Sequence, residues 1–169
     1  TIWYAGSEQM GISVSNGTCT TPVVNPGSTQ PFETSCGAIT ISSSDVQAIN
    51  GDRNIAVKLA SGSNPLTTGA WSFTLTGTSI TNGRFDAWSG DEVAKFTTDI
   101  DTTITLVNGG TATKAITIAS YITRPSNGSA NDPQNPVNAS VGDISSFSSL
   151  GPRRSCCDTS KCPSVQKPD

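Results

Sequence analysis

The sequence predicts an all-β protein, an antiparallel β-sandwich of the jelly-roll kind followed by an irregular C-terminal tail. Apolar residues recur at every second position in several short runs, which is the pattern of a strand with one buried face. Turn-forming pairs such as Asn16-Gly17 and Asn82-Gly83 separate these runs. Serine and threonine make up about 28% of the residues, and the β-branched threonine packs well on a pleated surface.

Six runs carry the alternation. Each places Ile, Val, Leu, Trp or Phe on one face and mostly small or polar residues on the other, and in chain order they span residues 11–15, 38–42, 54–59, 70–76, 103–107 and 115–119. Short strands separated by turns indicate two packed antiparallel sheets. The best helix candidate is a weak one, residues 44–50.

The chain changes character beyond its middle. Residues 124–143 are polar and have no period, and a stretch of that length is an exposed loop or a linker. The residues after Pro152 are also irregular and hold three of the five cysteines. We therefore expect a jelly-roll-like sandwich over residues 1–110, and a strand, a loop and a tail over residues 111–169.

Charge and composition exclude several classes of function. The formal net charge is −3, and the 10 Lys and Arg residues are scattered, so we expect no nucleic-acid partner. No apolar run approaches the ~18 residues of a membrane span, so we expect no membrane partner. The chain has no histidine, which excludes histidine-ligated metals and a complete Ser–His–Asp triad within these residues.

The five cysteines favour disulfides over a metal site. Four thiolates would be needed for zinc without histidine, and no Cys-x-x-Cys spacing is present. Disulfides suit a secreted or periplasmic protein. The simplest scheme pairs Cys19 with Cys36, and one of Cys156 or Cys157 with Cys162. The fifth cysteine is then either a free thiol or bonded to a partner outside the chain.

Two further groups of side chains are open to a functional and a structural interpretation. Asp99 and Asp101 could hold Ca²⁺ in a loop, but solvated turn carboxylates are the simpler interpretation, so we expect no cofactor. The aromatic residues Trp71, Phe73, Phe85 and Trp88 could form a platform for sugar stacking, although core packing on one face of a sandwich is the favoured interpretation.

Several segments together resemble the subtilisin-like serine proteases, or subtilases. Residues 113–121 are similar to a core strand of that family, and residues 109–112 (Gly-Gly-Thr-Ala) stand where it has Pro-Gly-Thr-Ala. The Phe-Ser-Ser-Leu-Gly-Pro turn at 147–152 and Lys-Pro-Asp at 167–169 follow in the family's order, the latter leading toward the nucleophile helix. Residues 69–88 resemble a jelly-roll insertion that some bacterial subtilases carry between the catalytic His and Ser.

The resemblance implies part of a secreted serine endopeptidase rather than a complete enzyme. The family's Asp, His, oxyanion Asn and nucleophilic Ser motifs are missing from these residues, so this chain alone is expected to be inactive. By the same resemblance, Val107 and Asn108 would help to form the wall of the substrate pocket. The implied partners are the rest of the parent protease and, through it, a peptide or protein substrate. Residues 115–121 could also drive self-association, because a core strand without its sheet needs another partner.

The alternative is a free-standing jelly-roll module that binds carbohydrate or protein. Trp3, Trp71 and Trp88 would supply the binding surface. This hypothesis accounts for residues 1–110 and leaves the ordered motifs at 147–152 and 167–169 to coincidence.

Overall fold

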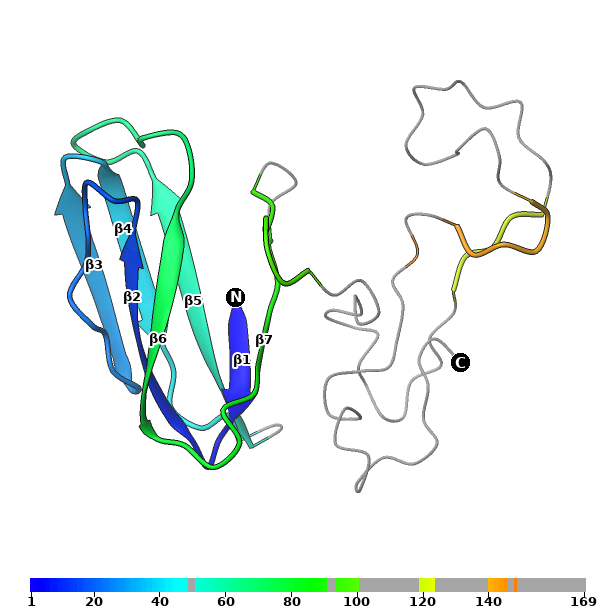
Figure 1. Cartoon of the computed structure of the whole chain (residues 1–169), viewed down its shortest axis with the longest axis horizontal. Helices are drawn as coiled ribbons and strands as arrows, with labels where there is room; N and C mark the ends of the chain where they lie inside the picture. Colours follow the sequence, from blue (N-terminus) through cyan, green and yellow to red (C-terminus); the bar gives the residue numbers. More distant parts are fainter. Residues whose placement is uncertain (49–50, 91–93, 101–118, 124–139, 146–147, 149–169) are drawn as a thin grey trace. The chain divides into compact units, whose positions relative to one another are not determined.

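The computed structural model describes residues 1–48, 51–90, 94–100, 119–123, 140–145 and 148 (Figure 1). The chain divides into two compact units, residues 1–95 and 96–169, which are considered separately below. The domain boundary expected at residue 110 lies outside the described residues.

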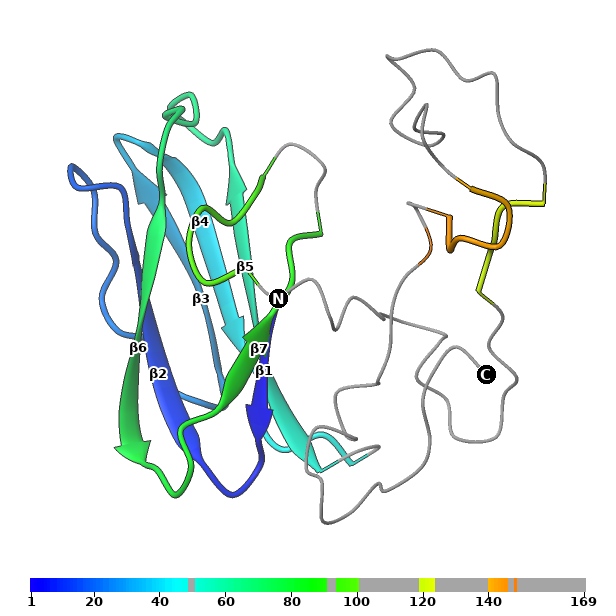
Figure 2. The same cartoon turned by 45° about the vertical axis from the view of Figure 1, so that its right-hand side comes forward.

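The first unit is an antiparallel β-sandwich, as predicted. One sheet has five strands in the order β3-β4-β5-β1-β7, and β2 pairs with β6 in a second sheet (Figures 1 and 2). Residues 20 and 24 extend the second sheet by isolated bridges to β2. The strands are β1 (Ile2–Ala5), β2 (Gln9–Ser15), β3 (Ser28–Thr34), β4 (Gly37–Ser43), β5 (Asp52–Ala60), β6 (Ser72–Ser79) and β7 (Phe85–Ala87).

Four of the predicted runs form strands, and three observed strands had no prediction. Strands β2, β4, β5 and β6 overlap the runs at 11–15, 38–42, 54–59 and 70–76. Strand β3 contains Pro31, which a sheet tolerates because β3 is an edge strand. The runs at 103–107 and 115–118 lie outside the described residues. The weak helix candidate at 44–50 is wrong over residues 44–48, which form no helix. Ser44 and Gln47 donate backbone hydrogen bonds to β5, and the Gln47 carbonyl accepts a single 2.8 Å bond from the Gly51 amide.

The core lies between the two sheets. Strand β4 places Ile39 and Ile41 inward, and β2 places Ile12 and Val14 opposite them, all fully or almost fully buried. At about 25 cal/mol per Å² of apolar surface, this burial is the main favourable term for folding. Half-buried side chains pack against the same cluster: Phe32, Val57, Leu59, Trp71, Phe73, Leu75 and Ala87. The favoured core interpretation is thus confirmed for Trp71 and Phe73, whereas Phe85 is 44% exposed.

The chain passes between the sheets several times, and two of these crossovers meet. The connections β1–β2 and β6–β7 each leave one sheet and enter the other, and they lie at the same end of the sandwich (Figure 1). They position the buried carboxylate described below.

Within the described part of the second unit, residues 120–122 and 142–145 form a short antiparallel pair. Tyr121 forms a bridge with Ile144, and Ile122 exchanges backbone hydrogen bonds with residues 142 and 143 at 2.8 and 2.9 Å. The hydroxyls of Ser120 and Ser145 lie 2.9 Å apart beside this pair.

Candidate functional site

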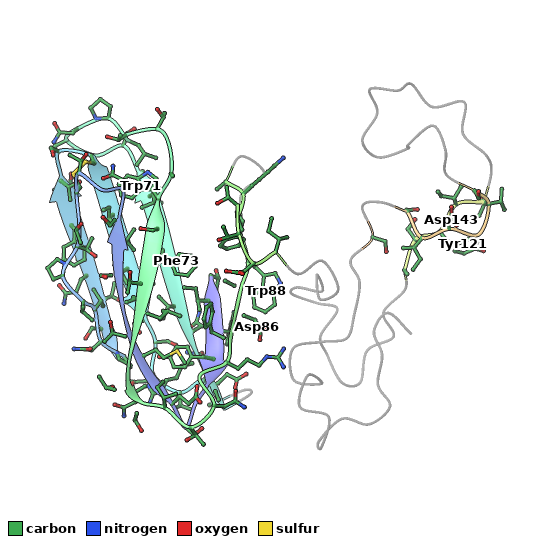
Figure 3. The ribbon with its side chains drawn as sticks, viewed as in Figure 1. Trp71, Phe73, Asp86, Trp88, Tyr121 and Asp143 are labelled. Carbon is green, nitrogen blue, oxygen red and sulfur yellow. A yellow bond between two sulfur atoms is a disulfide. The ribbon has the colours of Figure 1, made fainter. Side chains whose placement is uncertain are left out.

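Two of the three tryptophans proposed for ligand binding lie together on the outer face of β1 and β7. Trp3 stands between the buried residues Ile2 and Tyr4, so its side chain points to the opposite face of the sheet. Asp86 is its direct partner on β7, and Trp88 is two residues further along (Figure 3). Trp3, Asp86 and Trp88 are all half-buried, and we call them the outer tryptophan face.

The carboxylate on this face is held by a neighbouring cation. Arg84 Nη2 lies 3.3 Å from Asp86 Oδ1, and the two side chains are 45% and 20% exposed. An exposed pair of this kind contributes at most about 1 kcal/mol to stability, so its main effect is to orient Asp86. Two indole rings beside an oriented carboxylate can stack on the apolar face of a sugar ring and accept a hydrogen bond from its hydroxyls.

The third tryptophan has a different role. The Trp71 indole Nε1 donates a 3.1 Å hydrogen bond to the Thr67 carbonyl, and its ring packs against the core cluster. Figure 3 shows Trp71 near Phe73, away from Trp88. The structure therefore removes Trp71 from the predicted binding surface and leaves Trp3 and Trp88.

The structure describes only some of the other predicted site residues. Cys19 and Cys36 form a disulfide, as predicted, with a Cα–Cα distance of 6.2 Å. Such a bond fits an oxidising compartment, and among the described residues no helix is long and apolar enough to cross a membrane. The remaining predicted residues lie outside the described ranges: Val107, Asn108, Cys156, Cys157 and Cys162.

The structure describes only one of the two carboxylates proposed for Ca²⁺. Asp99 has a positive φ of 53°, and its neighbour Ile100 is 63% exposed. Asp101 lies outside the described residues. No group of three or more potential metal-ligating side chains is present in the described part of the chain.

Sequence reasoning missed Glu8, the most buried charged residue of the part of the chain that the structure describes. It lies in the β1–β2 crossover and is 1% exposed. Its Oε1 accepts three backbone hydrogen bonds from the β6–β7 crossover: from Asn82 at 2.6 Å, Gly83 at 2.9 Å and Thr81 at 3.3 Å. Gly83 has a φ of +75°, a conformation that glycine adopts without strain. Glu8 therefore connects the two crossovers, and we call this arrangement the Glu8 clamp.

Two opposing effects set the pKa of Glu8. Burial raises the pKa because it disfavours the charged form, while the hydrogen bonds from Gly83, Asn82 and Thr81 lower it. The hydrogen bonds prevail, and the pKa of the carboxyl lies below its ordinary value of 4.5. Glu8 is therefore a carboxylate at neutral pH.

The Glu8 clamp predicts a loss of stability in acid. Since the pKa is lower in the folded than in the unfolded state, the stabilisation is fully present above about pH 4.5 and is lost as the pH falls through the folded pKa. We expect the free energy of unfolding of the natural chain to fall more between pH 5 and pH 3 than that of Glu8→Gln, whose side chain does not titrate. Urea unfolding of both proteins at the two pH values measures the difference, and parallel pH profiles would contradict this role.

Comparisons with protein-family models, curated proteins and solved structures gave no match to this chain. The subtilase resemblance therefore rests on the ordered motifs of the sequence, and functional arguments rest on those motifs and on the geometry above.

Proposed function

We propose that this chain is an accessory β-sandwich, with the core strand that follows it, of a secreted subtilisin-like serine endopeptidase. The catalytic Asp, His, Asn and Ser would lie in other parts of that protease. The proposal draws on the ordered motifs at 109–121, 147–152 and 167–169. One structural observation carries it further, the pairing of the first and the last strand of the sandwich.

Strands β1 and β7, the first and last strands among the described residues, are neighbours, so the start of β1 and the end of β7 lie side by side. The Thr1 nitrogen donates a 2.8 Å hydrogen bond to the Trp88 carbonyl, and the Trp88 amide donates a 2.8 Å bond to the Thr1 carbonyl. A body whose two ends are adjacent can be inserted into a loop of another domain without disturbing it. This is the arrangement that a jelly-roll insertion between the catalytic residues of a protease requires.

The proposal predicts that this chain has no hydrolytic activity of its own. None of its serines has a histidine base, because the chain contains no histidine. We expect a fluorophosphonate probe to leave the chain unlabelled while it labels a bacterial subtilisin in a parallel reaction. Intact-protein mass spectrometry measures the labelling, and stoichiometric modification of one serine would overturn the proposal.

The second candidate function is carbohydrate binding through the outer tryptophan face. The observation that favours it is the placement of Trp3 directly across from Asp86 on β1, with Trp88 two residues beyond Asp86. Stacking of a sugar on an indole ring is worth on the order of 1 kcal/mol, so two rings would give weak but measurable binding.

This candidate predicts a specific pattern among tryptophan variants. If a β-glucan or chitin oligosaccharide quenches the intrinsic fluorescence, Trp88→Ala should weaken binding about fivefold, since one stacking platform is lost. Trp71→Phe is the matched control because Trp71 packs against the core, and its affinity should stay unchanged. An equal loss in both variants, or no saturable quenching by any oligosaccharide, would exclude this function.

A further inference from the structure

The part of the chain that the structure describes contains two complete Asn-Gly pairs, Asn16-Gly17 and Asn82-Gly83. Such a pair can modify itself, because the backbone nitrogen of the glycine can attack the side-chain amide carbon of the asparagine, and glycine has no Cβ that obstructs the attack. The first pair directly follows β2, and the second is bound by Glu8, which precedes β2. The two pairs therefore offer a comparison within one molecule.

The self-modification of the second pair needs no reactant other than water. The Gly83 nitrogen loses its proton and forms a bond to Asn82 Cγ, while the Cγ–Nδ2 bond breaks. Ammonia leaves with that proton, and a cyclic succinimide remains. Water then opens the ring at either carbonyl and gives aspartate or isoaspartate. Because a backbone amide is a weak nucleophile until it is deprotonated, any contact that keeps the proton on the Gly83 nitrogen slows the reaction.

Glu8 opposes this attack in two ways. The Gly83 amide donates a 2.9 Å hydrogen bond to Glu8 Oε1, so loss of its proton would place a negative nitrogen beside a buried carboxylate. Repulsion between the two like charges disfavours that step. The Asn82 amide donates a 2.6 Å bond to the same oxygen, so the backbone is held on both sides of the Asn82 Cα. The rotation that would bring the Gly83 nitrogen toward Cγ must break one of these bonds.

At the first pair the glycine amide has a neutral acceptor. The Gly17 amide donates a 3.1 Å hydrogen bond to Ser15 Oγ. The Asn16 Oδ1 accepts bonds from two backbone amides of its own turn, at 3.1 and 2.8 Å. These bonds do not involve Glu8. A change at Glu8 should therefore alter the reaction at Asn82 and leave the reaction at Asn16 as it is.

We propose that Asn82-Gly83 is a latent self-modification site, which Glu8 keeps unmodified by holding the Gly83 amide. In isoaspartate the main chain runs through the side-chain carbonyl, so one more carbon would separate the two amides that now meet at Glu8 Oε1. The modified turn could no longer place both amides on one oxygen. Modification would thus open the Glu8 clamp permanently, and the β6–β7 crossover would be released from the β1–β2 crossover.

The first test compares the natural chain with Glu8→Gln during storage in mildly alkaline buffer made with H₂¹⁸O. Ring opening takes an oxygen from water, so peptide mapping by mass spectrometry measures the modification of Asn82 and Asn16 separately. Glu8→Gln should speed modification of Asn82 by at least about tenfold, since a hydrogen bond to a charged group and a like-charge repulsion are both removed.

The internal control of this test is Asn16, whose rate should be the same in both proteins. An equal acceleration at both asparagines would show that the fold as a whole protects Asn82. An unchanged rate at Asn82 would show that Glu8 gives no protection. Either result would overturn the proposal.

The second test uses the natural chain, so it does not depend on the folding of a variant. The acetylated and amidated peptide Ile-Thr-Asn-Gly-Arg-Phe, residues 80–85, carries the same pair without Glu8. Its asparagine should be modified at least about tenfold faster than Asn82 in the folded chain. Chains with isoaspartate at position 82, separated after storage, should unfold at a lower urea concentration than unmodified chains. Equal rates in peptide and protein, or an unchanged unfolding midpoint, would contradict the proposal.

Discussion

Replacing Glu8 with alanine should destabilise the sandwich by about 3 kcal/mol. The carboxylate is buried and accepts three backbone hydrogen bonds, and bonds to a charged acceptor are among the strongest that a protein makes. Its removal leaves the donors of residues 81–83 without their acceptor and releases the β6–β7 crossover from the β1–β2 crossover. Water replaces part of what is lost, because Thr81 and Asn82 are exposed, which keeps the expected loss below the sum of three bonds.

Glu33→Ala is the matched control for this prediction. Glu33 is exposed and accepts one backbone hydrogen bond from Ser63 at 3.1 Å, so its removal should cost no more than about 1 kcal/mol. Urea unfolding followed by tryptophan fluorescence gives both values. If the two variants lose the same stability, Glu8 does not act as a clamp.

The second large effect is expected at the disulfide. The double variant Cys19→Ala/Cys36→Ala should lose about 3 kcal/mol, since the bond closes a loop with a sequence separation of 17. The bond joins the segment that follows β2, in one sheet, to the turn between β3 and β4, in the other. Glu8 precedes β2 and Cys19 follows it, so the two devices connect the sheets at both ends of the same strand.

Adding a reductant to both proteins distinguishes the stability that the Cys19–Cys36 bond contributes from any contribution of the other three cysteines. In the natural chain, dithiothreitol should lower the free energy of unfolding by about the same 3 kcal/mol. In the double variant it should remove none of this stabilisation, because the bond is already absent. An unfolding midpoint that is unchanged in the double variant would show that the Cys19–Cys36 bond contributes nothing to stability.

The parts of the fold that sequence reasoning predicted are those with a buried and an exposed face. Strand β4 alternates between buried and half-buried residues along its length, and this alternation is visible as Ala-Ile-Thr-Ile-Ser. Strand β3 contains Phe32 as its main apolar residue and Pro31 in the middle, so nothing in its composition indicates a strand. Strand β3 forms because its backbone pairs with β4. This pairing depends on the tertiary structure and is not visible in the composition of residues 28–34.

In the candidate sites, too, local features could be predicted from the sequence and contacts between distant segments could not. The Asn82-Gly83 turn was predicted, but its partner Glu8 could not be, because their hydrogen bonds span 74 and 75 residues. A lone glutamate next to an apolar strand was the available signal. The grouping of Trp3 with Trp88, and the exclusion of Trp71, likewise depend on the register between β1 and β7. The Cys19–Cys36 disulfide could be predicted from the sequence because the two residues are close along the chain.

The pairing of β1 with β7 brings the start of β1 beside the end of β7, and the proposed role as an insertion in a protease depends on it. The outer tryptophan face belongs to the sandwich itself. It could bind a ligand whether or not the surrounding protein is a protease, so the two proposed functions can fail independently.

The reading frame that encodes this chain tests the proposed function most directly. Sequencing the transcript on both sides should reveal Asp-Thr-Gly and His-Gly-Thr motifs upstream and a Gly-Thr-Ser motif downstream, since the proposal places the whole catalytic triad outside these residues. A frame that contains no such triad around the chain would contradict the proposal and favour the free-standing binding module.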